Sequence, residues 1–214
     1  MKQFFDIEEN NHYKISLMQP NGDTINIGSL QFSYNSCADE IISVINKEIT
    51  TEGSQVKELF QVNFDRKLNI ISMFSQGVLN GSEYEFSCKS QKGKFNLNFK
   101  TTGLEKKHTV NIKKNFYENN NFPFMLIPIL QGKSSISAEV FVPLTADFVE
   151  VEANKINSAE MYLLDEKEIS CERFKINVAG SMQASQYFLY CSKTGRLVKG
   201  IIGNQLIELD QIIR

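Results

Sequence analysis

Apolar and polar side chains alternate along most of this chain with a period of two residues. The apolar positions are odd-numbered in residues 13–27 and even-numbered in residues 30–34. Such alternation places one set of side chains on a buried sheet face and the other set in water. Gly28 lies where the phase changes, and one extra unpaired residue there would produce the change, so we predict a β-bulge at this point.

Further alternating runs follow at short, regular intervals. They cover residues 56–64, 84–88, 95–99, 108–112, 136–142, 148–151, 161–164, 174–178, 187–191, 197–202 and 206–209. The pairs Asp65-Arg66, Asn80-Gly81, Lys92-Gly93 and Thr102-Gly103 separate several of them and are typical of hairpin turns. The pattern therefore predicts an all-β protein, a long antiparallel meander of roughly a dozen strands in a single domain over residues 1–214.

Two stretches need a separate interpretation. The isoleucines of residues 40–50 have helical spacing, but the excess of β-branched residues favours a strand. Residues 115–132 are Asn-rich and then apolar, and Pro123 and Pro128 disfavour a long helix, so we predict a loop or short turn. Burial of each large apolar side chain there would gain roughly 1.5–3 kcal/mol. The segment could be a core-covering crossover, a ligand-capping lid or a contact for another protein.

The composition narrows the class of protein. The 214 residues are 42% hydrophobic and 22% charged, with a net charge of −2, which is too balanced to attract nucleic acid. The longest nearly continuous apolar run, residues 122–130, is far below the ~20 residues of a membrane-spanning helix. Residues 1–9 lack the apolar core of a secretory signal, so we expect a cytoplasmic protein, or a periplasmic or extracellular one if a signal peptide was removed.

The four cysteines form no Cys-x-x-Cys pair, and with only two histidines the sequence offers no convincing zinc site. We expect free thiols, no metal and no cofactor. One pair can be tested by geometry: if a hairpin turns about Ser181, Cys171 lies opposite Cys191 and Phe174 opposite Phe188. The two cysteine Cα atoms would then lie about 4.5–5.5 Å apart, within reach of a disulfide.

The last sixty residues carry a pattern with a known counterpart. The segments 158–164, 169–176, 186–199 and 206–209 resemble the end of a family of uncharacterised bacterial curved-sheet proteins, which are similar in layout to the lipoprotein-carrier fold. The strongest likeness is the hairpin in which Tyr187–Tyr190 leads through Lys193-Thr194-Gly195 into residues 196–199. The resemblance implies a half-barrel or incomplete barrel with an apolar concave face, and none of its motifs is catalytic.

Three functional hypotheses follow. The first is a non-catalytic binder or carrier of a hydrophobic, lipid-like ligand on the concave face, because a curved sheet of this size can enclose a small ligand. Its expected aromatic and lid contacts are Tyr84, Phe86, Phe95, Phe99, Phe124 and Met125.

The second hypothesis is a small cavity enzyme of the isomerase or cyclase type. His108 shares the inward phase of Val110, and Glu58 interrupts an inward apolar series, so either could act as an acid or base, or contact a ligand. The chain has no nucleophile elbow, phosphate loop or metallopeptidase motif. The third hypothesis is a structural or interaction module that docks a partner, or a second copy of itself as a homodimer, through the apolar segment 115–132.

Overall fold

The computed structural model describes residues 9–37, 39–113, 116–164, 166–179 and 185–213. All fifteen strands in this part of the chain belong to one sheet. Its N-terminal strands are β1 (Glu9–Met18), β2 (Thr24–Cys37), β3 (Glu40–Thr51), β4 (Ser54–Asp65), β5 (Ile70–Leu79), β6 (Ser82–Gln91), β7 (Lys94–Thr101) and β8 (Leu104–Asn111). After β9 (Phe116–Glu118) and helix α1 (Phe122–Leu130) come β10 (Ser135–Val142), β11 (Asp147–Leu164), β12 (Lys167–Val178), β13 (Gln186–Cys191), β14 (Leu197–Ile202) and β15 (Gln205–Ile212).

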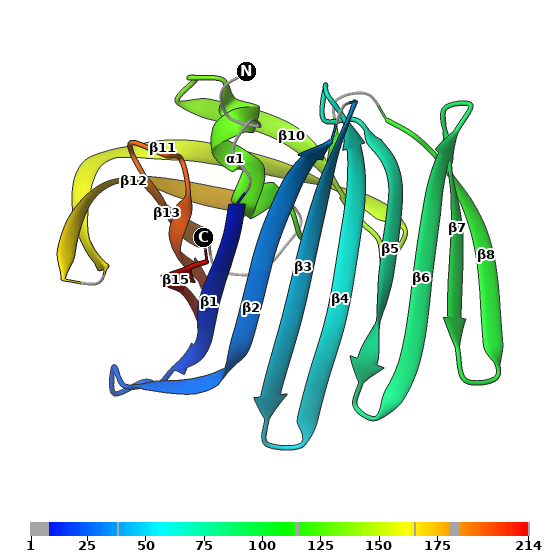
Figure 1. Cartoon of the computed structure of the whole chain (residues 1–214), viewed down its shortest axis with the longest axis horizontal. Coiled ribbons are helices and arrows are strands. Elements are labelled where there is room, and N and C mark those ends of the chain that lie inside the picture. Colours follow the sequence, from blue (N-terminus) through cyan, green and yellow to red (C-terminus); the bar gives the residue numbers. More distant parts are fainter. Residues whose placement is uncertain (1–8, 38, 114–115, 165, 180–184, 214) are drawn as a thin grey trace.

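The strand order is that of two meanders joined at β1. The sheet begins at β8, runs back through consecutive hairpins to β1, continues through β15 and ends at β9. All neighbouring strands are antiparallel except β9 and β10, which are parallel. In Figure 1, β1 to β8 stand side by side while β10 to β12 cross behind their upper part. The predicted meander, curled into an incomplete barrel, is confirmed.

The two ends of the sheet meet through side chains. The ring of Phe95 on β7 lies 5.3 Å from that of Phe116 on β9 and 5.1 Å from that of Phe141 on β10. Such ring pairs contribute about 0.5–1.5 kcal/mol each beyond the area they bury. β8 and β9 are the two end strands of the described sheet, and no backbone hydrogen-bond ladder connects them. Aromatic side chains therefore pack across the gap between the two ends.

Several local predictions are confirmed. Gly28 pairs with Ile15 and Asn26 with Ser16, so Ile27 is the extra residue of a bulge beside the glycine. The stretch with ambiguous spacing forms strand β3. The four predicted turn pairs each lie at a hairpin of the β4 to β8 meander. Positive φ angles close two of these turns, at Asn80 and Gly81 and at Lys92 and Gly93.

The prediction of a loop over residues 115–132 is wrong for its central part, because residues 122–130 form helix α1. Pro123 lies in the first turn, where the missing N–H costs nothing, and nine residues are short enough to accommodate Pro128. The helix lies on the concave side of the sheet (Figure 1) and buries six of its nine residues. Phe124 stacks on Phe32 of β2 with ring centroids 4.3 Å apart, and the Tyr190 hydroxyl donates to the Pro123 carbonyl at 2.6 Å.

Candidate functional site

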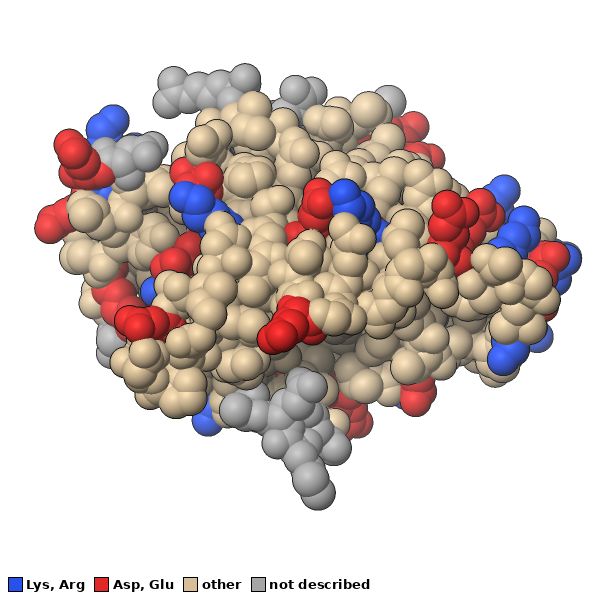
Figure 2. All heavy atoms as spheres, turned by 90° about the horizontal axis from the view of Figure 1, so that it is seen from below, with Lys and Arg blue, Asp and Glu red and all other residues tan. Residues whose placement is uncertain are grey.

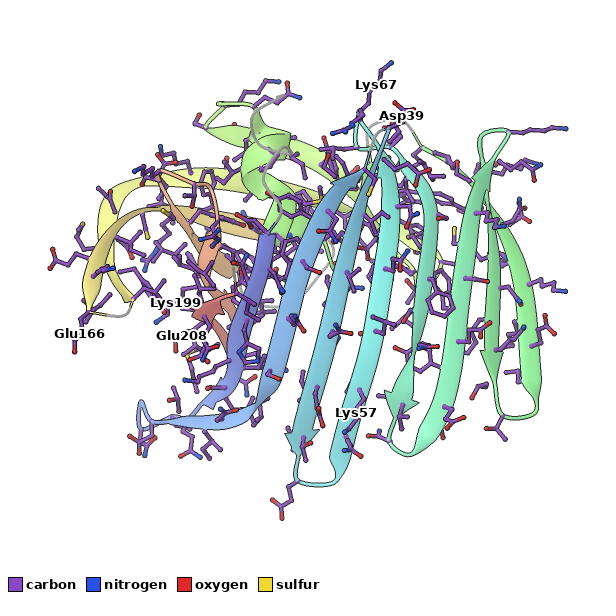
Figure 3. The ribbon with its side chains drawn as sticks, in the orientation of Figure 1. Asp39, Lys57, Lys67, Glu166, Lys199 and Glu208 are labelled. Carbon is purple, nitrogen blue, oxygen red and sulfur yellow. The ribbon has the colours of Figure 1, made fainter. Side chains whose placement is uncertain are left out.

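The concave face of the sheet is covered at one end and open at the other. Helix α1 covers the upper end, where Leu126 is fully buried and Met125 and Ile129 are each 5% exposed. Strands β3 to β6 reach well below the level at which β10 to β12 cross behind them (Figure 1). Figure 3 places Lys57 near the lower end of β4, and Asp39 and Lys67 at the upper end, in the connections from β2 to β3 and from β4 to β5. The lower end is therefore the part of this face that another molecule could reach.

Aliphatic side chains line this lower end. Ile25, Leu79 and Leu104 are exposed by 49%, 50% and 45%, although they belong to the same face as the core. The registers establish the face: Ile25 pairs with Leu17, Leu79 with Val56, and Leu104 with Thr101, which pairs with Tyr84. We name the five residues Leu17, Ile25, Val56, Leu79 and Leu104 the aliphatic rim.

A buried polar cluster lies one step above the rim. Glu58, two residues along β4 from Val56, is about 7 Å from it along the strand. Its carboxylate oxygen Oε2 lies 2.8 Å from Lys47 Nζ on β3, and the Ser75 hydroxyl donates to Oε1 at 3.1 Å. The Ser75 hydroxyl is also 3.3 Å from the phenol oxygen of Tyr84. Strands β3 to β6 thus supply one ammonium, one carboxylate and two hydroxyls to a single polar cluster.

The cluster settles the charge of Glu58. Burial alone would raise the pKa of this carboxyl, but the Lys47 ammonium and the hydrogen bonds from Lys47, Tyr84 and Ser75 hold it below its ordinary value. Burial raises the pKa of Tyr84 to about 12. Glu58 is therefore an ionised, paired carboxylate, and Tyr84 is a neutral hydroxyl near neutral pH.

The sequence-predicted ligand contacts separate into two groups. Glu58, Tyr84 and Phe99 lie together beside the rim, and the rings of Tyr84 and Phe99 stack with centroids 6.2 Å apart. Phe86, Phe95 and Met125 are buried in the core, and Phe124 of α1 stacks on Phe32 of β2. The structure thus brings three of the predicted residues to a surface that is open, and places four others against the protein's own side chains.

His108 does not join Glu58. It pairs with Leu97 on the concave face as its phase predicted, but β8 is an end strand of the sheet and the imidazole is exposed. Four strand spacings separate β8 from β4, which is roughly 19 Å along the sheet. An acid and base need hydrogen-bond reach of the same reacting group. The structure therefore assembles no acid/base pair from these two residues.

Sequence reasoning missed Glu118, which is 1% exposed at the end of β9. Its carboxylate accepts hydrogen bonds from the backbone N–H groups of Asn120 and Asn121 and from the Asn121 side-chain amide, at 2.8 to 2.9 Å. The Asn121 side chain also accepts a hydrogen bond from Ser43 on β3. Burial raises the pKa of Glu118 to about 7. The sequence did carry a signal for it: Glu118 directly precedes an Asn-rich stretch and an apolar segment. Carboxylates in such positions often accept hydrogen bonds from the free N–H groups at the start of a helix.

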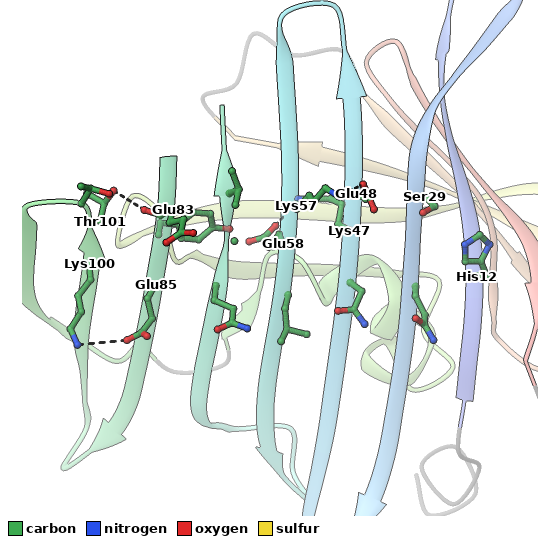
Figure 4. Close-up of a pocket in the computed structure, with 18 residues that line it drawn as sticks. His12, Ser29, Lys47, Glu48, Lys57, Glu58, Glu83, Glu85, Lys100 and Thr101 are labelled. Atoms are coloured by element: carbon green, nitrogen blue, oxygen red, sulfur yellow. Dashed lines mark hydrogen bonds and ion pairs between the residues drawn. The ribbon is translucent and has the colours of Figure 1, made fainter. Parts of the chain in front are cut away.

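A groove also lies on the outer face of the sheet. It has a volume of about 840 Å³ and crosses β1 to β7. The strand registers arrange its outward side chains in two rows, one through Asn46, Gln76 and Glu85 and one through Glu48, Lys57 and Glu83. Figure 4 labels Glu85 in the first row and the three members of the second. The lining of the groove also includes Lys47, Glu58 and Tyr84, which alternate with the outward residues along their strands. The ion pairs Lys57–Glu48 (2.6 Å) and Lys100–Glu85 (3.7 Å) neutralise much of its charge.

A second groove of about 680 Å³ lies over β10 to β12 and contains Glu139, Glu150 and Glu152. Within the described ranges, no three His, Cys, Asp or Glu side chains converge as a metal site would require. The same ranges contain no helix with the length and apolar character needed to cross a membrane.

Viewed from below, residues other than Lys, Arg, Asp and Glu cover most of the surface, and Lys and Arg gather toward the β6 to β8 side (Figure 2).

Comparisons with known proteins bear on the fold alone. No family model matches this sequence, and no curated protein matches it. A crystal structure of a beta-barrel-like protein of the domain of unknown function DUF1849, from Brucella abortus, is similar with a TM-score of 0.58 and 9% sequence identity. The alignment covers 97% of this chain and 96% of that protein. The all-β curved sheet thus has a counterpart among solved structures.

A second solved structure matches more loosely. It is a putative exported protein with a YmcC-like fold from Bacteroides fragilis, with a TM-score of 0.32 and 7% identity over 96% of this chain and 95% of that one. A likeness this weak carries no argument about location or function.

Proposed function

We propose that this protein is a non-catalytic binder of an amphipathic, lipid-like molecule, held at the open lower end of the concave face. The apolar body of the ligand lies across the aliphatic rim. Its polar head meets the cluster of Lys47, Glu58 and Tyr84. The sequence hypothesis placed a hydrophobic ligand on the concave face with Phe124 and Met125 as lid contacts, and the proposal keeps that ligand class and that face but uses the rim for its contacts.

The observation that carries the proposal is the exposure of Ile25, Leu79 and Leu104 on a face that is elsewhere the core. Large aliphatic side chains exposed on one contiguous face are typical of ligand-binding or interaction surfaces. If a ligand covered them, each methylene group buried on its chain would gain about 0.8 kcal/mol. Ligand chain length should therefore control affinity.

The polar cluster supports an amphipathic ligand over a purely apolar one. Lys47 Nζ has three N–H donors, and Glu58 takes one of them. The side chain of Lys47 is 26% exposed, so it is not fully enclosed by its own chain. Because hydrogen bonds to a charged donor are stronger than neutral ones, an anionic or strongly accepting head group suits this position.

Two further points favour a binder over the alternatives. The resemblance of residues 158–209 to proteins of lipoprotein-carrier layout implies an apolar concave face. The aliphatic rim, where we propose that the ligand binds, belongs to that face. An interaction module docking through residues 115–132 loses its basis, because six of the nine α1 residues are buried against their own chain.

Titration calorimetry with dodecanoate tests the proposal. Wild-type protein should bind dodecanoate more tightly than decanoate, by up to about tenfold for two buried methylene groups with imperfect contact. Leu79→Asp places a carboxylate on the rim and should weaken binding at least tenfold. Leu144→Asp is the matched control, because Leu144 is 69% exposed in the turn between β10 and β11 and lies outside the rim.

Head-group chemistry gives a second arm. Dodecanol has the same chain without the carboxylate, so it should bind less tightly than dodecanoate if Lys47 holds the head. Equal binding of dodecanoate by wild type and Leu79→Asp would overturn the rim as the site, and no binding of any of these amphiphiles would overturn the function.

A further inference from the structure

Cys171 and Cys191 are directly opposed on neighbouring strands. The register of β12 and β13 pairs Cys171 with Cys191 and Phe174 with Phe188, which confirms the predicted pairing, while the predicted turn at Ser181 lies outside the described residues. Directly opposed residues of an antiparallel pair project from the same face of the sheet. The two thiols therefore share one face.

The hydrogen bonds place the cysteines at the closer kind of pairing. Ser192 N–H donates to the Ser170 carbonyl at 2.9 Å, so the pair 170 and 192 is hydrogen-bonded. The next pair, Cys171 and Cys191, is then non-hydrogen-bonded, with Cα atoms about 4.5 Å apart. Consistent with this, Cys191 N–H points away from β12 and donates to the Arg196 carbonyl at 2.8 Å. A separation near 4.5 Å lies within the range of disulfides.

The two thiols differ in exposure and surroundings. Cys171 is fully buried, and its Sγ contacts the Ile169 carbonyl at 3.4 Å, whereas Cys191 is part-exposed at the start of the turn into β14. Burial raises the pKa of Cys171 to about 11. Burial acts on Cys191 too, but hydrogen bonds from the Thr194 hydroxyl and the Thr194 and Lys193 N–H groups, with the charge of Arg196, hold its pKa below the ordinary value.

We propose that Cys191 and Cys171 form a thiol–disulfide exchange site for small-molecule disulfides, with Cys191 as the attacking thiol and Cys171 as the resolving thiol. The Cys191 thiolate attacks one sulfur of the disulfide R–S–S–R, forms a mixed disulfide and expels RS⁻. The Cys171 sulfur then attacks Cys191 Sγ, the bond from Cys191 to R–S breaks, and the departing RS⁻ takes the Cys171 proton. The two protein thiols are oxidised by two electrons, and R–S–S–R is reduced to two thiols.

The two other cysteines provide the controls. Cys37 is exposed and Cys88 is buried in the core on β6, so Cys37→Ser gives a background in which only the proposed pair can react from solvent. Reduced Cys37→Ser protein is treated with oxidised glutathione, quenched with acid and analysed by intact-protein mass spectrometry and peptide mapping. It should lose the mass of two hydrogens and give a peptide that joins Cys171 to Cys191.

The single replacements separate the steps. Adding Cys171→Ser should abolish ring closure and leave one glutathione attached to Cys191, because no resolving thiol is present. Adding Cys191→Ser should abolish the Cys171–Cys191 disulfide and the glutathione adduct at residue 191. The total reaction of the protein with oxidised glutathione should then fall at least tenfold. Circular dichroism of each variant verifies that the sheet is intact.

Two results would overturn the proposal. One is a stable glutathione adduct in the Cys37→Ser protein without ring closure, which would mean that Cys171 cannot reach the mixed disulfide. The other is reaction of the folded Cys191→Ser variant at an undiminished rate, which would mean that Cys191 is not the attacking thiol.

Discussion

The upper and lower ends of the concave face are built from the same strands and the same alternation, yet they differ in what covers them. At the upper end, Phe124 of α1 stacks on Phe32 and Leu126 is fully buried. At the lower end, Ile25 and Leu79 are about half exposed on the same face. Strand alternation decides which face is apolar, and the element packed on that face decides whether it becomes core or stays exposed.

The comparison predicts that two leucines of equal size differ strongly in their contribution to stability. Leu126→Ala leaves a cavity under α1 and should lower the free energy of unfolding by about 2–5 kcal/mol. Leu79→Ala on the rim should lower it by less than about 1 kcal/mol, since half of the side chain is already in water. Urea denaturation of both variants measures the difference, and equal losses would contradict the division into a covered and an open end.

The two buried carboxyls should respond to pH in opposite directions. Because the folded-state pKa of Glu118 is raised from 4.5 to about 7, the folded protein binds that proton more tightly than the unfolded chain. Its contribution to stability is full below pH 4.5 and falls by about 3 kcal/mol as the pH rises to 7. Glu118→Gln cannot ionise, so its stability between these pH values should change less with pH than that of the wild type.

Glu58 provides the reverse case at the lower end. Its pKa is lowered by Lys47, so its contribution is present above the unfolded value and is lost as the pH falls through the folded value. In Glu58→Gln, unfolding followed by fluorescence or circular dichroism from pH 5 down to pH 3 should show a shallower loss of stability than in the wild type. For the other carboxyl, the contradicting result is a plot of unfolding free energy against pH for Glu118→Gln that runs parallel to that of the wild type between pH 4.5 and 7. It would show that Glu118 titrates normally.

The bulge that shapes β2 near the rim can be tested by adding one methyl group. A Cβ atom at Gly28 would lie 1.9 Å from the Glu48 carbonyl oxygen of β3, so β2 and β3 would have to separate. Gly28→Ala should cost about 1–3 kcal/mol of unfolding free energy. Ser29→Ala, at the adjacent position, is the control and should change it by less than about 0.5 kcal/mol. Equal effects of the two would mean that the strand adjusts at no cost.

Much of the fold was predictable because each step depended on local chemistry. The phase change at Gly28 predicted the bulge, turn residues such as Asn80-Gly81 predicted the hairpins, and symmetry about Ser181 predicted the facing of Cys171 and Cys191. These features depend on residues that are neighbours in sequence or across one turn.

The features that depend on distant contacts were predicted less well. Helix α1 forms despite two prolines because the concave face buries its apolar side chains, a tertiary effect that local propensity does not contain. The positions of Phe86 and Phe95 on the concave face followed from alternation, but the burial of Phe95 depends on Phe116 and Phe141, which lie on distant strands. The pairing of Glu58 with Lys47 required the β3 to β4 register, which places those two residues opposite each other.

The most direct test of the central proposal is where a ligand binds on this face. Methyl-resolved NMR spectra recorded during a dodecanoate titration distinguish the methyl groups of Ile25, Leu79 and Leu104 from those of Leu126 and Ile129 on α1. The proposal predicts that the rim methyl signals shift in proportion to bound dodecanoate while the α1 signals stay in place. Shifts confined to Leu126 and Ile129, with the rim unchanged, would contradict it and place the ligand under the helix.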